Sequence, residues 1–283
     1  MRSRSLRPLG LAAVPAVLAT LALRAAPVPP TVAVTATDYA LAAPDTLHEG
    51  AVRFQLTNRG KEFHHLWVIR LEQGKTLAEF RAALSSGGPF PAWARSLGGP
   101  NAPAPEGGEA NATLVLAAGR YLLVCGIPSP DGVPHMMKGM IRPLTVVAGR
   151  EAAAAPRADI TMSLRDYSFV LSGSLAPGRR VIEVRNDGDQ THEVELVRLA
   201  PGKSVHDVLA WVEKPASPPP GLPLGGVTPL ARGGVASFEV DLAPGHYYGM
   251  ICFLPDAKDG KPHHEHGMIQ EFGVGDGAKI SAR

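Results

Sequence analysis

The chain has 283 residues, which is enough for two domains of ordinary size, and 45% of them are apolar, which is enough to bury a core. Only 19% are charged and the formal net charge is +2, so the sequence lacks the basic blocks typical of nucleic-acid binding. With 31 glycines and 27 prolines, the composition favours many strands joined by turns over long helices.

The first thirty residues (1–30) differ in character from the rest. Three arginines precede an apolar run from Leu9 to Leu23, and a proline-rich stretch follows. This order is typical of a secretory signal peptide, with cleavage after Ala19 or Ala22, and the run is short of the roughly 20 apolar residues that a spanning helix needs. An uncleaved N-terminal anchor that associates with the membrane is the alternative. In both cases we expect a periplasmic or otherwise extracytoplasmic protein.

The rest of the chain contains an internal duplication. The stretch TATDY from Thr35 is similar to SLRDY from Ser163, and matching residues recur at an offset of 127 or 128 positions. The recurring pairs are Asp38 and Asp166, Tyr39 and Tyr167, Asn58 and Asn186, His64 and His192, Cys125 and Cys252, and His135 and His263. We therefore predict two domains, residues 31–149 (the first repeat) and 159–276 (the second repeat), with a linker at 150–158 and a tail at 277–283.

Within each repeat the pattern predicts mostly strands. VRFQLT (52–57) and SFEVDL (237–242) alternate apolar and polar residues, whereas HLWVIRL and YLLVC are continuous apolar runs, as in strands buried on both faces. One helix per repeat is indicated by the capping box of Thr76 and Glu79 and by its counterpart at 204–212. This content predicts an all-β fold of two tandem Greek-key β-sandwich domains, each with one short helix.

Each repeat also contains His, Cys, His and Met in the same order. Strand alternation places the early His of each repeat toward the core, and the Cys lies near the end of a later strand. Two imidazoles, a thiolate and a weak thioether form the ligand set of a blue-copper electron-transfer site. The candidate metal ligands are His64, Cys125, His135 and Met140 in the first repeat and His192, Cys252, His263 and Met268 in the second.

These residues lie in motifs that resemble the cupredoxin family of type 1 blue-copper proteins. GRYLLVC (119–125) matches the family's Gly-x-Tyr-x-x-x-Cys strand, and HMMKGM (135–140) and HHEHGM (263–268) match its His-x-x-x-Gly-Met ending. The resemblance covers both repeats. It implies one or two type 1-like copper sites, single-electron transfer, and a partner such as a c-type cytochrome or a membrane electron-transfer complex.

The sequence also departs from the simple members of that family. Ten and eleven positions separate Cys from the late His, a length similar to the loops of copper nitrite reductases and multicopper oxidases. The Asn that usually follows the early His is replaced by His65 and Glu193, which predicts weaker support of the site. No His adjoins either Cys, and ten histidines leave too few for the additional copper centres of those enzymes. We therefore predict that the chain is not an enzyme.

Several alternatives remain at this point. Cys125 and Cys252 could be buried thiols without a metal, whereas a disulfide between them is disfavoured because the duplication places them in equivalent interior positions. The chain could be a copper-free scaffold subunit of a membrane-bound electron-transfer complex, such as a photosynthetic reaction centre or an oxidase. It could also handle copper, with Cu(I) held by His135, Met136, Met137 and Met140 and Cu(II) held by His263, His264 and His266.

Overall fold

The computed structural model of the chain describes residues 28–149 and 153–275. The predicted signal or anchor segment lies outside these residues except for positions 28–30, and the tail at 277–283 lies outside them altogether. Among the described residues, no helix combines the length and the apolar character needed to cross a membrane.

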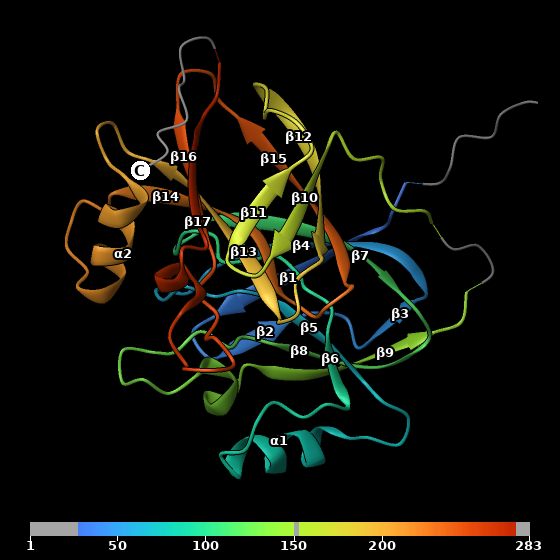
Figure 1. Cartoon of the computed structure of the whole chain (residues 1–283). Helices are drawn as coiled ribbons and strands as arrows, with labels where there is room; N and C mark the ends of the chain where they lie inside the picture. The colour runs from blue at the N-terminus through green and yellow to red at the C-terminus, as the bar shows by residue number, and fades with distance from the viewer. Residues whose placement is uncertain (1–27, 150–152, 276–283) are drawn as a thin grey trace, which may run out of the picture.

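The described part of the first repeat forms strands, one α-helix and one 3-10 turn (Figure 1). In chain order these are β1 (Thr31–Thr37), β2 (Ala40–Ala42), β3 (Thr46–His48), β4 (Gly50–Asn58), β5 (Trp67–Leu71), α1 (Leu77–Ser85), β6 (Ala94–Ser96), β7 (Glu109–Leu116), β8 (Gly119–Val124), the 3-10 turn His135–Lys138 and β9 (Ile141–Val147).

The described part of the second repeat forms a similar series of elements, without an equivalent of β3. In chain order these are β10 (Ile160–Arg165), β11 (Ser168–Leu171), β12 (Gly178–Asn186), β13 (His192–Leu199), α2 (Val205–Glu213), β14 (Gly221–Leu230), β15 (Val235–Leu242), β16 (Tyr247–Ile251), the 3-10 turn His263–His266 and β17 (Ile269–Gly273).

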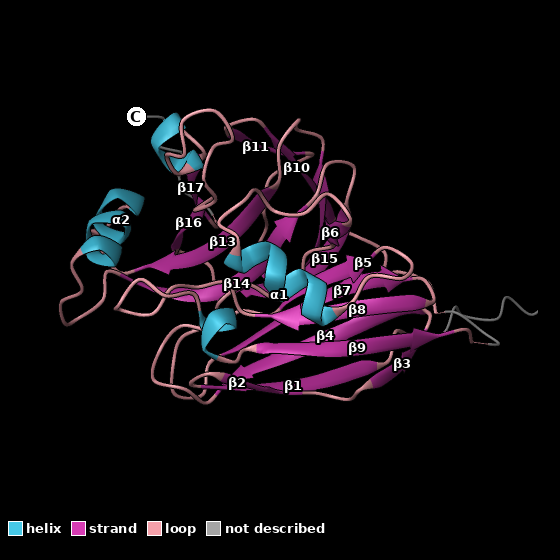
Figure 2. Ribbon diagram, turned by 90° about the horizontal axis from the view of Figure 1, so that it is seen from below, coloured by secondary structure: helices cyan, strands magenta, loops and turns pink. Residues whose placement is uncertain are grey.

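These strands form three sheets, one of which runs through both repeats. The shared sheet has the order β11-β10-β12-β15-β7-β4-β1-β2, because β15 pairs with β7 across the repeats. Each repeat adds a smaller sheet, β3-β9-β8-β5-β6 in the first and β14-β13-β16-β17 in the second. Figure 2 shows the strands as the body of the molecule, with α1 and α2 outside them. The prediction of an all-β fold with one short α-helix per repeat is confirmed.

The core lies between each half of the shared sheet and the smaller sheet of the same repeat. Phe54 and Leu114 of the shared sheet belong to the same buried cluster as Val68 and Leu123 of the first repeat's smaller sheet. Full burial of each such side chain contributes about 1.5–3 kcal/mol. Most of the buried apolar residues of both repeats belong to one continuous cluster, and each repeat has a further, smaller cluster of its own.

Local hydrogen bonds define the two α-helices. The Thr76 hydroxyl accepts from the backbone N–H of Glu79, and the Glu79 carboxylate accepts from the backbone N–H of Thr76. Ser204 and Asp207 form the same capping box before α2. An N-terminal cap of this kind contributes about 1 kcal/mol, so both helix starts follow from short-range chemistry. The predicted capping boxes are confirmed.

The repeats meet through equivalent segments that pair with each other. Residues 97–103 run antiparallel to 224–230, with bridges from Leu97 to Leu230 and from Pro100 to Val227. At the offset of 127, Leu97 corresponds to Leu224 and Pro100 to Val227, so the same surface of each repeat faces its counterpart. We call this contact the junction.

Two glycines permit the close approach of backbones beside the junction. Gly99 and Gly226 have φ of +146° and +134°. A Cβ atom on Gly99 would lie 2.0 Å from the Leu66 carbonyl oxygen, and one on Gly226 would lie 2.2 Å from the Val194 carbonyl oxygen. Any other residue would clash with a neighbouring strand at both positions.

The junction also buries two carboxyl groups on the outer face of β13. Glu193 and Glu195 are each 6% exposed. The backbone N–H of Ala102, in the first repeat, donates to Glu195 Oε2 at 3.1 Å, and Glu195 Oε1 has no hydrogen-bond partner among the described residues. Burial raises the pKa of Glu195 well above 4.5, and the neighbouring Glu193 raises it further. Glu195 is therefore protonated in the folded chain under conditions where it ionises in the unfolded chain.

This difference predicts that the free energy of unfolding decreases as pH rises above about 4.5, by about 1.4 kcal/mol per pH unit for each such group. Glu195→Gln should remove the contribution of one carboxyl group to this dependence of the unfolding free energy on pH. Urea unfolding of the metal-free protein at several pH values from 5 to 7 measures it. The exposed Glu72→Gln is the control and should keep the wild-type slope. Identical slopes in wild type and Glu195→Gln would show that Glu195 ionises normally in the folded protein.

Candidate metal centres

The chain brings the candidate ligands of the first repeat together through two segments. His64 lies just before β5, whereas Cys125, His135 and Met140 lie in the connection from β8 to β9. The Cys125 N–H donates to the Met140 carbonyl at 3.0 Å, and the Met140 N–H donates to the His135 carbonyl at 3.0 Å. The long Cys–His loop is therefore a hairpin, which a bridge between Pro128 and Pro134 closes.

The second repeat has the same arrangement. The Cys252 N–H donates to the Met268 carbonyl at 3.2 Å, and the Met268 N–H donates to the His263 carbonyl at 3.0 Å. Met140 and Met268 are fully buried in the same apolar cluster as the cysteines. In both repeats the late His begins the 3-10 turn directly after a proline.

Three ligand atoms converge in the first repeat. The Nδ1 atoms of His64 and His135 are 3.0 Å apart, and Cys125 Sγ lies 3.4 Å from His135 Nδ1 and 4.0 Å from His64 Nδ1. All three side chains are fully buried. The first cluster is therefore a group of two imidazole nitrogens and one sulfur that could hold a metal ion.

The second cluster repeats this geometry. His192 Nδ1 and His263 Nδ1 are 3.0 Å apart, and Cys252 Sγ lies 3.4 Å from His263 Nδ1. The other two histidines of HHEHGM point elsewhere: His264 packs edge-on against Phe253, and His266 contacts Asp259. His263 is thus the histidine that the structure places beside Cys252, as the repeat predicts.

Carboxylates outside the clusters orient the histidines, and the sequence analysis did not identify them. His64 Nε2 lies 2.9 Å from Asp38 Oδ1, His135 Nε2 lies 2.8 Å from Glu62 Oε2, and His192 Nε2 lies 2.7 Å from Asp166 Oδ1. An imidazole that donates its Nε2–H to a carboxylate presents the Nδ1 lone pair to a metal and becomes more basic. The recurring Asp-Tyr pairs were the available signal, because Asp38 and Asp166 are the first residues of those pairs.

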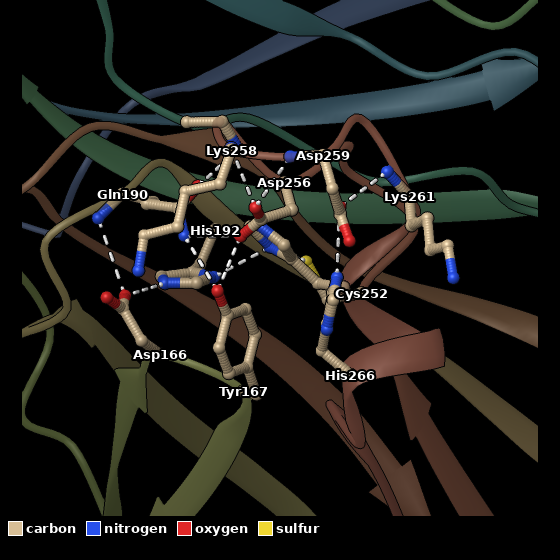
Figure 3. Close-up of polar contacts among 12 residues, drawn as sticks. Asp166, Tyr167, Gln190, His192, Cys252, Asp256, Lys258, Asp259, Lys261 and His266 are labelled. Atoms are coloured by element: carbon tan, nitrogen blue, oxygen red, sulfur yellow. Dashed lines mark hydrogen bonds and ion pairs between the residues drawn. The ribbon is translucent and has the colours of Figure 1, made fainter.

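The fourth histidine has a different environment. In the second repeat Gln190 replaces Glu62, and the nearest carboxylate comes from Asp256 in the Cys–His loop (Figure 3). Asp256 accepts hydrogen bonds from the Tyr167 hydroxyl at 2.5 Å and from Gln190 at 2.7 Å, which lower its pKa. It lies 4.0 Å from His263 Nε2, which has no hydrogen-bond partner among the described residues. The two clusters thus have the same kinds of ligand atoms, and they differ in the residues that surround the late His.

The prediction of weak support at the positions after the early His is wrong. The His65 side chain accepts a hydrogen bond at Nε2 from the Gly126 N–H at 2.8 Å, and Glu193 accepts one from the Phe253 N–H at 3.2 Å. Both donors directly follow the cysteines, so each residue ties the Cys strand to the His strand. The two side chains are long enough to reach that backbone even though neither is Asn.

Both cysteines are free thiols in the folded chain, as the duplication predicts. Burial raises the pKa of Cys125 to about 12 and also raises the pKa of Cys252. The thiols are therefore protonated without a metal at neutral pH, and a metal that binds them must displace the proton.

No protein-family model matches the sequence, and a search of curated proteins finds no match. Among solved structures, the chain is similar to auracyanin A, a blue copper protein of Chloroflexus aurantiacus, with 22% identity over 42% of this chain and 99% of that chain and a TM-score of 0.30. It is also similar to a multicopper oxidase, with 14% identity over 86% of this chain and 88% of that chain and a TM-score of 0.25.

A copper-containing nitrite reductase of Thermus scotoductus is a third such structure, with 11% identity over 88% of this chain and 62% of that chain and a TM-score of 0.24. The recognised likeness to cupredoxins is confirmed, since these structures are those of copper proteins. The prediction that the chain is not an enzyme is contradicted, because a multicopper oxidase and a copper-containing nitrite reductase are among the similar proteins.

Burial of the thiols predicts slow reaction with a thiol reagent. Because the thiolate is the reactive form and both sulfurs are inaccessible, Cys125 and Cys252 should label with 5,5′-dithiobis(2-nitrobenzoic acid) far more slowly at pH 8 in the folded metal-free chain than in urea, where two thiols per chain should react rapidly. Rapid labelling of either cysteine without urea would contradict the buried clusters.

Proposed function

We propose that the chain binds copper at two type 1-like sites and transfers single electrons. The observation that carries this proposal is the convergence of two Nδ1 atoms and one Sγ atom, fully buried, in each repeat. The proposed ligands are His64, Cys125 and His135 with Met140, and His192, Cys252 and His263 with Met268. The proposed domains are two tandem Greek-key, cupredoxin-like units, residues 31–149 and 159–276.

The donor atoms suit copper. A thiolate and a thioether favour Cu(I), and imidazole binds both oxidation states, so the set tolerates a one-electron change. Bound copper would supply that change in oxidation state. The chain's own residues place the Nδ1 atoms at the centre of each cluster, exclude water and favour the neutral form of His64 and His263. Burial lowers the pKa of His64, and burial together with neighbouring His192 lowers the pKa of His263 to about 4, so protons do not compete for these nitrogens at neutral pH.

We further propose that the protein works outside the cytoplasm, in a periplasm or at its membrane. The basic and apolar N-terminal segment (1–30) supports this location. The proposed partner is a redox protein of the cell envelope, such as a c-type cytochrome or a membrane electron-transfer complex, because such partners exchange single electrons.

The direct test is a Cu(II) titration of the purified protein, followed by visible absorption. We expect an intense thiolate-to-copper band that saturates at two copper ions per chain. Cys125→Ser and Cys252→Ser should each leave one site and part of the band, and the double variant should leave none. No band and no bound metal would contradict the proposal and favour a copper-free scaffold, whereas tight, colourless Cu(I) binding would favour copper handling.

The outer carboxylates should strengthen metal binding. In a Cys125→Ser background, where only the second site remains, Asp166→Asn should weaken Cu(II) binding about 10–100-fold, because His192 loses a negatively charged acceptor. Competition titration with a chelator measures this affinity. Asp189→Asn is the matched control, since Asp189 is exposed and pairs with Arg232, and it should leave the affinity unchanged. Equal affinities of the Asp166 and Asp189 variants would refute the role of the outer carboxylate.

A further inference from the structure

Each late histidine has a carboxylate beside it, but the two repeats supply that carboxylate from different positions. In the first repeat it comes from Glu62, in the connection from β4 to β5. In the second repeat the same position holds Gln190, and the carboxylate comes from Asp256 in the Cys–His loop. The repeats therefore differ in the origin of a charged group next to a candidate metal ligand.

The counterpart of Asp256 in the first repeat is Ser129. An offset of 127 relates the two residues, and both lie in Cys–His loops that a bridge between two prolines closes, at 128–134 and 255–262. Each is only 4% exposed. Two positions near the late His thus hold one acidic and one neutral residue in both repeats, and the acidic residue has changed place between them.

The carboxylate of the first repeat contacts the late imidazole directly. His135 Nε2 lies 2.8 Å from Glu62 Oε2, and the Tyr39 hydroxyl donates to Glu62 Oε1 at 2.7 Å. When Nδ1 of His135 binds a metal, the proton of the neutral ring is on Nε2, and Glu62 accepts it. Tyr39 occupies the other carboxylate oxygen, so it holds Oε2 toward the ring.

The carboxylate of the second repeat makes no such contact. Asp256 Oδ2 accepts from the Tyr167 hydroxyl at 2.5 Å and from Gln190 at 2.7 Å (Figure 3). It lies 4.0 Å from His263 Nε2, beyond hydrogen-bond distance. The His263 ring is fully buried, and its Nε2 has no hydrogen-bond partner among the described residues.

Other contacts of the ligands are alike in the two repeats. A tyrosine ring meets the late imidazole edge-on, with 5.6 Å between ring centroids in both. The cysteine sulfur lies 3.4 Å from Nδ1 of the late His in both. The early histidines contact Asp38 at 2.9 Å and Asp166 at 2.7 Å. These contacts do not distinguish the sites, whereas the hydrogen bond at Nε2 of the late His does.

We propose that the second site is reduced before the first, because Glu62 hydrogen-bonds His135 whereas His263 lacks such a bond. This inference rests on the proposed function. An imidazole that donates to a carboxylate is a more basic ligand. Its attraction is larger for Cu(II), which carries one more positive charge than Cu(I). The hydrogen bond therefore stabilises Cu(II) in the first site and lowers the reduction potential of that site.

Glu62 acts here as a positioning residue, because it reaches the metal only through His135. Reduction of either site adds one electron, supplied by the proposed redox partner, and converts Cu(II) to Cu(I). The Nε2 proton stays on the imidazole in both oxidation states. Gln190 cannot take the part of Glu62, since its amide donates to Asp256 and its oxygen accepts from the Ala257 N–H at 2.7 Å.

Redox titration of copper-loaded, full-length chains with one site each tests the order of reduction. Cys252→Ser keeps the first site and Cys125→Ser keeps the second, and the thiolate-to-copper band reports the oxidation state. The first site should have the lower potential. In Cys252→Ser, Glu62→Gln should weaken Cu(II) binding roughly 10–100-fold relative to Cu(I) binding, which raises the potential by about 59 mV for each tenfold change. The exposed Glu72→Gln is the matched control and should leave the potential unchanged.

The reverse exchange tests the same claim in the second site. In Cys125→Ser, the combination of Gln190→Glu and Asp256→Ser gives the second repeat the residues of the first and should lower the potential. This variant also serves if Glu62→Gln does not fold. In the diamagnetic Cu(I) forms, proton NMR should show the Nε2–H of His135 further downfield than that of His263, because a carboxylate accepts it.

Equal potentials of the two single-site chains, or a lower potential at the second site, would overturn the inference. So would a potential that neither Glu62→Gln nor the reverse exchange changes. If neither single-site chain develops a thiolate-to-copper band, the result counts against the proposed function itself.

Discussion

The structure depends on one local constraint, the convergence of two histidine Nδ1 atoms on a cysteine sulfur inside each repeat. Two imidazole nitrogens and one sulfur lie close together in an apolar interior, where buried polar atoms without partners are costly. The fold supports the arrangement from both sides. The Cys-to-Met hairpin fixes three of the residues by backbone hydrogen bonds, and Asp38 and Asp166 hold the early histidines from outside.

The two clusters have the same ligand atoms, but the carboxylates that surround the late His differ. His135 has a direct carboxylate partner in Glu62, whereas His263 faces Asp256 at 4.0 Å. The carboxylate near His263 already accepts from Tyr167 and Gln190, so it supports that ring less directly. Since outer hydrogen bonds tune ligand basicity, the two sites are expected to differ in their affinity for copper and in reduction potential.

Much of this arrangement could be predicted from the sequence, because the duplication shows which residues recur. The inward positions of His64 and Cys125 followed from strand alternation, and the choice of His263 followed from the offset. The residues that surround each cluster and hydrogen-bond to its ligands or their neighbours could not be predicted in the same way. Asp256 lies in a loop whose length differs between repeats, and simple strand alternation assigns the side chains of His65 and Glu193 to the face that points to the surface. That face is covered because the repeats bury it against each other, which depends on tertiary contacts between segments over 90 residues apart.

The central claim is that each cluster is a copper site with a thiolate ligand. X-ray absorption at the copper edge, on protein loaded with two copper ions per chain, tests it most directly. We predict one sulfur and two imidazole nitrogens as the close ligands of each copper ion, and we expect Cys125→Ser to bind one copper ion per chain with the same close ligands. Copper bound only by nitrogen and oxygen, with no close sulfur ligand in the wild type, would contradict the account.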